Sequence, residues 1–93
     1  MSRVIEKKNL PEYFEKILAG EKTYELRLAN WRCLSGDTIV LREIDPTTHE
    51  YTGRKLRRRV GYVGKTKDQR FFTKEEVDKH GFQIISLLNE DSQ

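Results

Sequence analysis

The sequence predicts an α+β fold: a small mixed β-barrel, closed or partly closed, of five or six strands with two short helices. Segments with strand-like patterns recur along the chain between turn residues, which is typical of small barrels. Two other segments carry helix signals. At 93 residues the chain has the length of one domain. We therefore expect a single domain over residues 1–93, with its core within about 4–88.

The first helix is expected near residues 10–19. Its apolar stripe, at helical spacing, consists of Leu10, Tyr13, Phe14, Ile17 and Leu18. Pro11 suits the first turn of a helix, and Gly20 can end it in the left-handed conformation. A second, short helix is expected behind the capping box Thr73-Lys74-Glu75-Glu76, with a glycine as its stop.

Strands are expected at residues 4–7, 24–28, 38–44, 54–63 and 82–88. In the second of these, Tyr24, Leu26 and Leu28 alternate with two charged residues. This period of two predicts a half-buried strand whose apolar face lies in the core and whose charged face points outward. Residues 82–88 are almost all apolar, which predicts a strand buried on both faces.

Composition argues against a disordered chain, a membrane-spanning segment and a metal site. The net charge is +3, and charged residues make up 35% of the chain, but nine aromatic residues argue against disorder. Cys33 is the single cysteine, and the sequence has no signal-peptide pattern, so a reducing, cytoplasmic setting is expected. No apolar run is long enough to span a membrane. The two histidines lack ligand spacing, so neither a metal nor another cofactor is expected.

One strand carries a concentration of basic residues. Lys55, Arg57 and Arg59 share one face of it and span ~13 Å at strand rise. Cations at this spacing suit a phosphate backbone, and their binding would be sensitive to salt and indifferent to base sequence. The alternative is a solvated edge strand that its charges protect against pairing with another chain.

The segment between the first helix and the next strand carries a family resemblance. Residues 20–27 read Gly-Glu-Lys-Thr-Tyr-Glu-Leu-Arg, which resembles the signature Gly-x-Lys-x-x-Glu-x-Arg of the ASCH domains. The Gly-Asp turn at 36–37, the segment 41–53 and the basic strand resemble a subgroup of small bacterial and phage ASCH-like proteins. The resemblance covers roughly residues 5–88.

This resemblance implies a PUA-like barrel with a cleft between the first helix and the barrel, where family members are proposed to bind RNA or nucleotides. Lys22 and Arg27 are candidates to hold a phosphate, and Glu25 to accept hydrogen bonds from a base or ribose. Trp31, in a loop, is a candidate to stack on a base, and Arg42 is a further candidate for nucleic-acid contact. The alternative without a binding function is an exposed ion pair between the arginine and the glutamate of the motif, which would stabilise the fold by ~0–1 kcal/mol.

Two other functions remain open, as do the oligomeric state and whether the chain is an enzyme at all. Some ASCH-like proteins are reported ribonucleases or amidohydrolases of N4-acetylcytidine, which use a lysine, a threonine and a glutamate. Lys22 matches that lysine. The threonine would fall three residues later, where this chain has Glu25, and Thr23, two residues before Glu25, is expected on the same face of the strand. In such an enzyme Lys22 would act as base or nucleophile, with Glu25 or Glu43 as proton-transfer partner. The remaining alternative is a protein-interaction module that uses an exposed strand edge.

Overall fold

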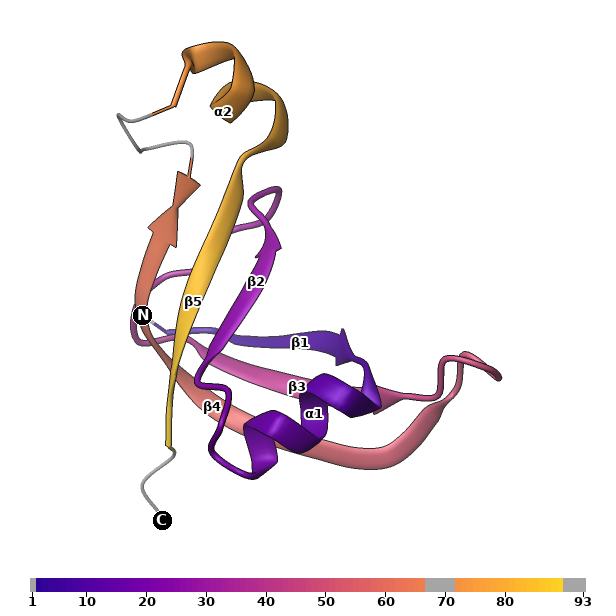
Figure 1. Ribbon diagram of the computed structural model, residues 1–93. Helices are drawn as coiled ribbons and strands as arrows, with labels where there is room; N and C mark the ends of the chain where they lie inside the picture. Colours follow the sequence, from indigo (N-terminus) through magenta and orange to yellow (C-terminus); the bar gives the residue numbers. More distant parts are fainter. Residues whose placement is uncertain (1, 67–71, 90–93) are drawn as a thin grey trace.

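The computed structural model describes residues 2–66 and 72–89 and confirms the α+β fold and the predicted order of elements. Figure 1 shows the strands β1, β2, β3, β4 and β5, which span Val4–Asn9, Tyr24–Leu28, Thr38–Ile44, Tyr51–Lys65 and Phe82–Leu88. The helices α1 and α2 span Pro11–Leu18 and Lys74–His80.

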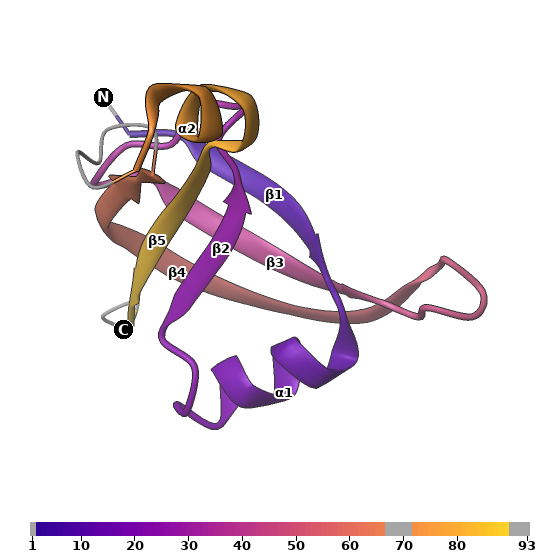
Figure 2. The same cartoon turned by 45° about the horizontal axis from the view of Figure 1, so that its top comes forward.

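The five strands form one mixed sheet in the order β1-β3-β4-β5-β2. β1 runs parallel to β3, and the other pairs are antiparallel. The long strand β4 serves both halves of the sheet, because its first part pairs with β3 and its second part with β5. A register shift between Val60 and Val63 bends it. The sheet curves into a half-barrel in which β2 and β5 cross the direction of β1 and β3 (Figures 1 and 2).

The helices form where local signals place them. Pro11 opens α1, and Gly20 follows it with φ of 83°, a conformation that favours glycine. The capping box of α2 is present, with Thr73 and Glu76 bonding each other's backbone N–H. The predicted stripe of α1 is only partly right, because Phe14 and Ile17 alone are buried in it. The core cluster inside the half-barrel consists of Ile17, Cys33, Ile39, Leu41, Val60, Ile85 and Leu87.

The orientation predicted for β2 is wrong. Tyr24, Leu26 and Leu28 are 46%, 56% and 55% exposed, whereas Glu25 between them is 3% exposed. The inward side of β2 faces polar groups of β1: Asn9 donates to the Glu25 carboxylate, which offsets its burial, and the carbonyl oxygen of Lys8 accepts from Arg27. The double burial predicted for β5 is also wrong, since Phe82 and other alternate residues of that strand are exposed.

A second buried carboxylate fastens α1 to the β3–β4 hairpin. Glu43 accepts hydrogen bonds from Thr52 Oγ1 at 2.7 Å and from Arg54 Nε and Nη2 at 3.0 and 2.9 Å. Arg54 also pairs with Glu15 of α1 and lies 4.7 Å from the ring centre of Phe14. Hydrogen bonds from Arg54, then from Thr52, hold the pKa of Glu43 below its usual range despite its burial.

Asp37 is the third buried carboxylate and closes the turn before β3. Its two oxygens accept the backbone N–H groups of Arg3 and Leu34, each at 2.9 Å. Burial alone would raise the pKa of Asp37, but these hydrogen bonds and the charge of Arg3 outweigh it, and the pKa is lowered.

Acid should therefore destabilise the fold in a defined window. A carboxyl group whose pKa is lower in the folded state contributes stability above its unfolded pKa, near 4, and loses it as pH falls through the folded pKa. We expect Glu43→Gln to lower the free energy of unfolding at pH 7 by about 1–3 kcal/mol, because Arg54 and Thr52 lose a charged acceptor. We also expect this difference to shrink below pH 4. Urea unfolding at several pH values measures both, with Glu50→Gln on the exposed hairpin loop as the control. Equal stability of Glu43→Gln and wild type at pH 7 would contradict a stabilising role for the ionised Glu43 carboxylate.

Candidate functional site

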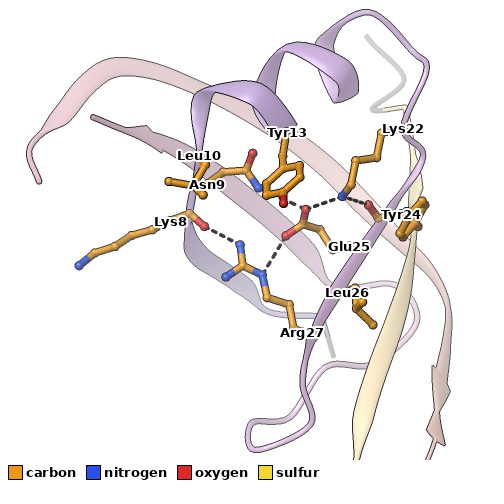
Figure 3. Close-up of a pocket in the computed structure, with 9 residues that line it drawn as sticks. All are labelled: Lys8, Asn9, Leu10, Tyr13, Lys22, Tyr24, Glu25, Leu26 and Arg27. Carbon is orange, nitrogen blue, oxygen red and sulfur yellow. Dashed lines mark hydrogen bonds and ion pairs between the residues drawn. The ribbon is translucent and has the colours of Figure 1, made fainter. Parts of the chain in front are cut away.

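A cleft of about 360 Å³ opens between α1 and β2, where the edge strands β1 and β2 approach each other. Figure 3 shows its lining residues: Lys8, Asn9, Leu10, Tyr13, Lys22, Tyr24, Glu25, Leu26 and Arg27. The three charged residues of the predicted motif, Lys22, Glu25 and Arg27, all belong to it. The structure therefore brings these three side chains together in one cleft.

Glu25 is the centre of the cleft. Its side chain is only 4% exposed. Oε1 accepts from Asn9 Nδ2 at 3.2 Å and from Lys22 Nζ at 3.3 Å, and Oε2 accepts from Arg27 Nε at 2.8 Å. Two cations and an amide thus surround one carboxylate, which is the condition under which a buried charge is tolerated.

Lys22 reaches into the cleft from the turn between α1 and β2. Besides Glu25, its ammonium donates to the carbonyl oxygen of Tyr24 at 2.7 Å. The same nitrogen lies 4.5 Å from the ring centre of Tyr24 and 5.5 Å from that of Tyr13. A cation between two aromatic rings is held in place by their faces, so Lys22 presents its charge at a fixed position.

Arg27 joins the two edge strands. Nε bonds Glu25 on its own strand, and Nη2 donates to the carbonyl oxygen of Lys8 on β1. A guanidinium has five N–H donors, so these contacts leave donors for a bound anion. Figure 3 shows the Lys8 side chain pointing away from the cleft, so that only the rest of this residue contributes to the lining.

Asn9 is a site residue that the sequence prediction missed. It is 5% exposed, and while Nδ2 bonds Glu25, Oδ1 has no hydrogen-bond partner among the described residues. A buried acceptor without a donor is uncommon and costs free energy. No sequence signal marked it, because an asparagine ahead of Leu10-Pro11 reads as a residue that simply precedes a helix.

The other predicted nucleic-acid residues lie outside the cleft. Trp31 packs against the core, with Lys7 Nζ 4.0 Å from its ring centre. Arg42 on β3 contacts Glu6 at 3.5 Å and lies 3.7 Å from the ring centre of Tyr51. Their roles in binding remain predictions, and neither side chain contributes to the cleft.

The strand register places the basic residues in a row beside the cleft. Lys8 on β1 pairs with Arg42 on β3, which pairs with Lys55 on β4, so the three side chains share the outer face of the sheet. Arg57 and Arg59 continue the same face along β4 and are exposed. We call these five residues the basic row. It begins at Lys8, whose carbonyl oxygen is bonded inside the cleft.

Residues 2–66 and 72–89 contain neither a cluster of metal-ligating side chains nor a membrane-spanning helix. No three potential metal-ligating side chains gather there. None of the helices in these ranges is long and apolar enough to cross a membrane.

Comparison with known proteins places this architecture in a family. Residues 5–77 match the model described as "Domain of unknown function (DUF3850)". The chain belongs to this family. Within this DUF3850 domain the match includes every residue that lines the cleft.

The DUF3850 domain also shares its fold with a solved structure. The crystal structure of hypothetical protein PH0355 aligns with a TM-score of 0.59 and 19% sequence identity, over 95% of this chain and 98% of that one. No curated protein matches the chain.

The geometry makes Glu25 the residue on which the cleft depends. We expect Glu25→Ala to lower the free energy of unfolding by about 2–3 kcal/mol, because Asn9, Lys22 and Arg27 lose their common charged acceptor. The matched control is Glu21→Ala, which removes an exposed carboxylate paired with Lys16 and should change stability by about 0.5 kcal/mol or less. Thermal or urea unfolding measures both. Equal effects of the two substitutions would contradict a central role for Glu25.

Proposed function

We propose that this chain is an ASCH-type, PUA-like module of the cytoplasm that binds RNA or a nucleotide in the cleft. The observation that carries the proposal is the meeting of Lys22, Glu25 and Arg27 in one cleft beside two tyrosine rings. Cations, carboxylate oxygens such as those of Glu25, and aromatic rings are three kinds of group that bind the phosphate, the hydrogen-bond donors and the base of a nucleotide.

Each part of a nucleotide has a matching group in the cleft. Lys22 and Arg27 supply positive charge and N–H donors for a phosphate. Tyr13 and Tyr24, on opposite elements, offer ring faces to a base.

The basic row favours a polynucleotide over a free nucleotide. Adjacent strands lie about 4.8 Å apart, so Lys8, Arg42 and Lys55 cover ~10 Å across the sheet, and Arg57 and Arg59 extend the row along β4. Lys55 does not line the cleft, so a free nucleotide held by Lys22 and Arg27 would leave it unused. A strand of RNA with one nucleotide in the cleft has further phosphates for the row to neutralise.

The first test is a titration with short single-stranded and duplex RNA at two salt concentrations. We expect Lys22→Ala/Arg27→Ala to weaken binding about 10–100-fold, because two charge-assisted contacts are lost. Since that variant leaves Glu25 without its cations, Tyr13→Leu serves as a second variant that removes a ring and keeps the charges. Lys16→Ala/Lys79→Ala is the control with the same change of net charge away from the cleft.

The outcomes separate binding from catalysis. Binding that all variants retain would place the RNA elsewhere and overturn the cleft assignment. Absence of binding to either RNA would favour the second candidate, a hydrolase of acylated cytidine or of RNA, for which the 3.3 Å contact of Lys22 with Glu25 is the supporting geometry. Turnover of N4-acetylcytidine that survives Lys22→Ala would exclude that mechanism.

A second prediction concerns the basic row. We expect Lys55→Gln/Arg57→Gln/Arg59→Gln to reduce the slope of log K against log salt by about two units for single-stranded RNA. The variant loses three phosphate contacts, so its binding releases fewer counterions. The loss of affinity should be similar for all base sequences. The control is Lys16→Gln/Lys74→Gln/Lys79→Gln, which changes the net charge equally on the helices. An unchanged salt slope in the variant of Lys55, Arg57 and Arg59 would show that these residues do not contact phosphates of the RNA.

A further inference from the structure

One outer surface of the half-barrel is apolar and uncovered in the part of the chain that the structure describes. It is formed by β2, β5 and the second part of β4. We call it the apolar face, and its members are Tyr24, Leu26, Leu28, Tyr62, Phe82, Ile84 and Leu88, which are 40–76% exposed. In Figures 1 and 2, α1 lies beyond one end of β2 and α2 beyond the opposite end of the β2–β5 pair.

The register shows that these residues form one continuous surface. Leu26 pairs with Ile84 and Leu28 with Phe82 across β2 and β5, so their side chains stand on the same side. Tyr24 pairs with Ser86, which adds a small uncharged residue. The Leu26–Ile84 pair lies at the centre of the β2–β5 ladder.

Two glycines of β4 lie beneath side chains of the face. A Cβ at Gly61 would lie 3.3 Å from the Leu88 side chain, and a Cβ at Gly64 would lie 3.5 Å from the Tyr62 ring. Leu88 and Tyr62 therefore lie next to glycine backbone, where a larger residue would crowd them. An apolar sheet surface is suited to pack on a second sheet about 10 Å away.

The area of this face is that of a protein interface. The exposed fractions of the seven residues add up to between three and four fully exposed residues. At ~200 Å² for a large side chain this is on the order of 700 Å². The largest apolar patch of a typical monomer is about 300–600 Å², whereas a standard interface buries about 800 Å² on each partner.

The rest of the sequence offers little to cover it. Outside the described ranges lie residue 1, residues 67–71 and residues 90–93, and only Met1 and Phe71 among them are large and apolar. Nucleic acid is disfavoured as the occupant, because the seven members of the face carry no cation for a phosphate. The exposed cations Lys55 and Arg57 of β4 pair with β3 on the other half of the sheet, and Arg59, which pairs with Leu88, borders the face at one end.

We propose that the apolar face packs against the same face of a second copy of this chain, forming a two-fold symmetric dimer. Such an interface uses one patch twice, so an apolar and uncharged surface is able to pack against its own copy. Lys55 and Arg57 of the basic row pair with β3 and stay outside the contact, whereas Arg59, which pairs with Leu88, lies at its border. Tyr24 and Leu26 belong to both the apolar face and the cleft, so each cleft would open beside the contact.

Sedimentation velocity of the full chain over a concentration series from about 1 to 300 µM tests the proposal. We expect the mass to rise from that of one chain, 11.0 kDa, to twice that value. Ile84→Lys, at the centre of the face, should keep the protein monomeric at every concentration. Val4→Lys is the matched control, because Val4 is an exposed apolar residue on β1, away from the face, and it should dimerise like wild type.

A second readout guards against a misfolded variant. Dimerisation makes the melting temperature rise with protein concentration, so wild type and Val4→Lys should show this rise and Ile84→Lys should melt at one temperature throughout. A wild-type mass of one chain over the whole series would overturn the proposal and leave the cleft assignment untouched. Dimerisation that Ile84→Lys retains would place the contact elsewhere and overturn it equally. Monomeric wild type whose Tyr62 and Phe82 are protected by added RNA would instead assign the face to nucleic acid.

Discussion

The buried carboxylate of Glu25 is the constraint on which the open side of the half-barrel depends. β1 and β2 are the two edges of the sheet and do not pair with each other. Asn9 at the end of β1 and Arg27 on β2 both bond Glu25, and Arg27 also bonds the backbone of β1. Side-chain hydrogen bonds thus join β1 to β2, where the other neighbouring strands are joined by backbone hydrogen bonds. We call this line of contact the seam, and the cleft opens along it.

This constraint also explains why β2 is turned against its hydrophobic pattern. Placing Glu25 at the seam forces its neighbours Tyr24 and Leu26 to the outside, since side chains alternate along a strand. Exposing three apolar residues gives up hydrophobic stabilisation, and burying a charge adds a cost that only paired partners offset.

Local signals in the sequence predicted the elements but could not orient them. The capping box at Thr73 and the Gly20 stop act within a few residues, so their outcomes follow from sequence alone. Alternation in β2 shows that two faces differ, but which one lies inward depends on partners such as Asn9, which is distant along the chain. The bidentate contact of Arg54 with Glu43 depends in the same way on hairpin register, which a loop with a left-handed His49 helps to set. The motif residues gather in the cleft because they lie on one turn and one short strand, where sequence distance limits spatial distance.

The bend in β4 divides the outer surface by chemistry as well as by geometry. Before the register shift that follows Val60 the outward residues include Lys55, Arg57 and Arg59, and after it they are glycines and Tyr62. Because this one strand pairs with β3 and then with β5, its outer side changes from charged to apolar along its length, and the two surfaces meet where Arg59 pairs with Leu88. The cleft lies where the two edges of that sheet meet, with Lys8 of the basic row on one side and Tyr24 of the apolar face on the other. A ligand in the cleft therefore lies between the two surfaces, and because Tyr24 and Leu26 belong to both the cleft and the apolar face, ligand binding and the proposed pairing of two chains would share these residues.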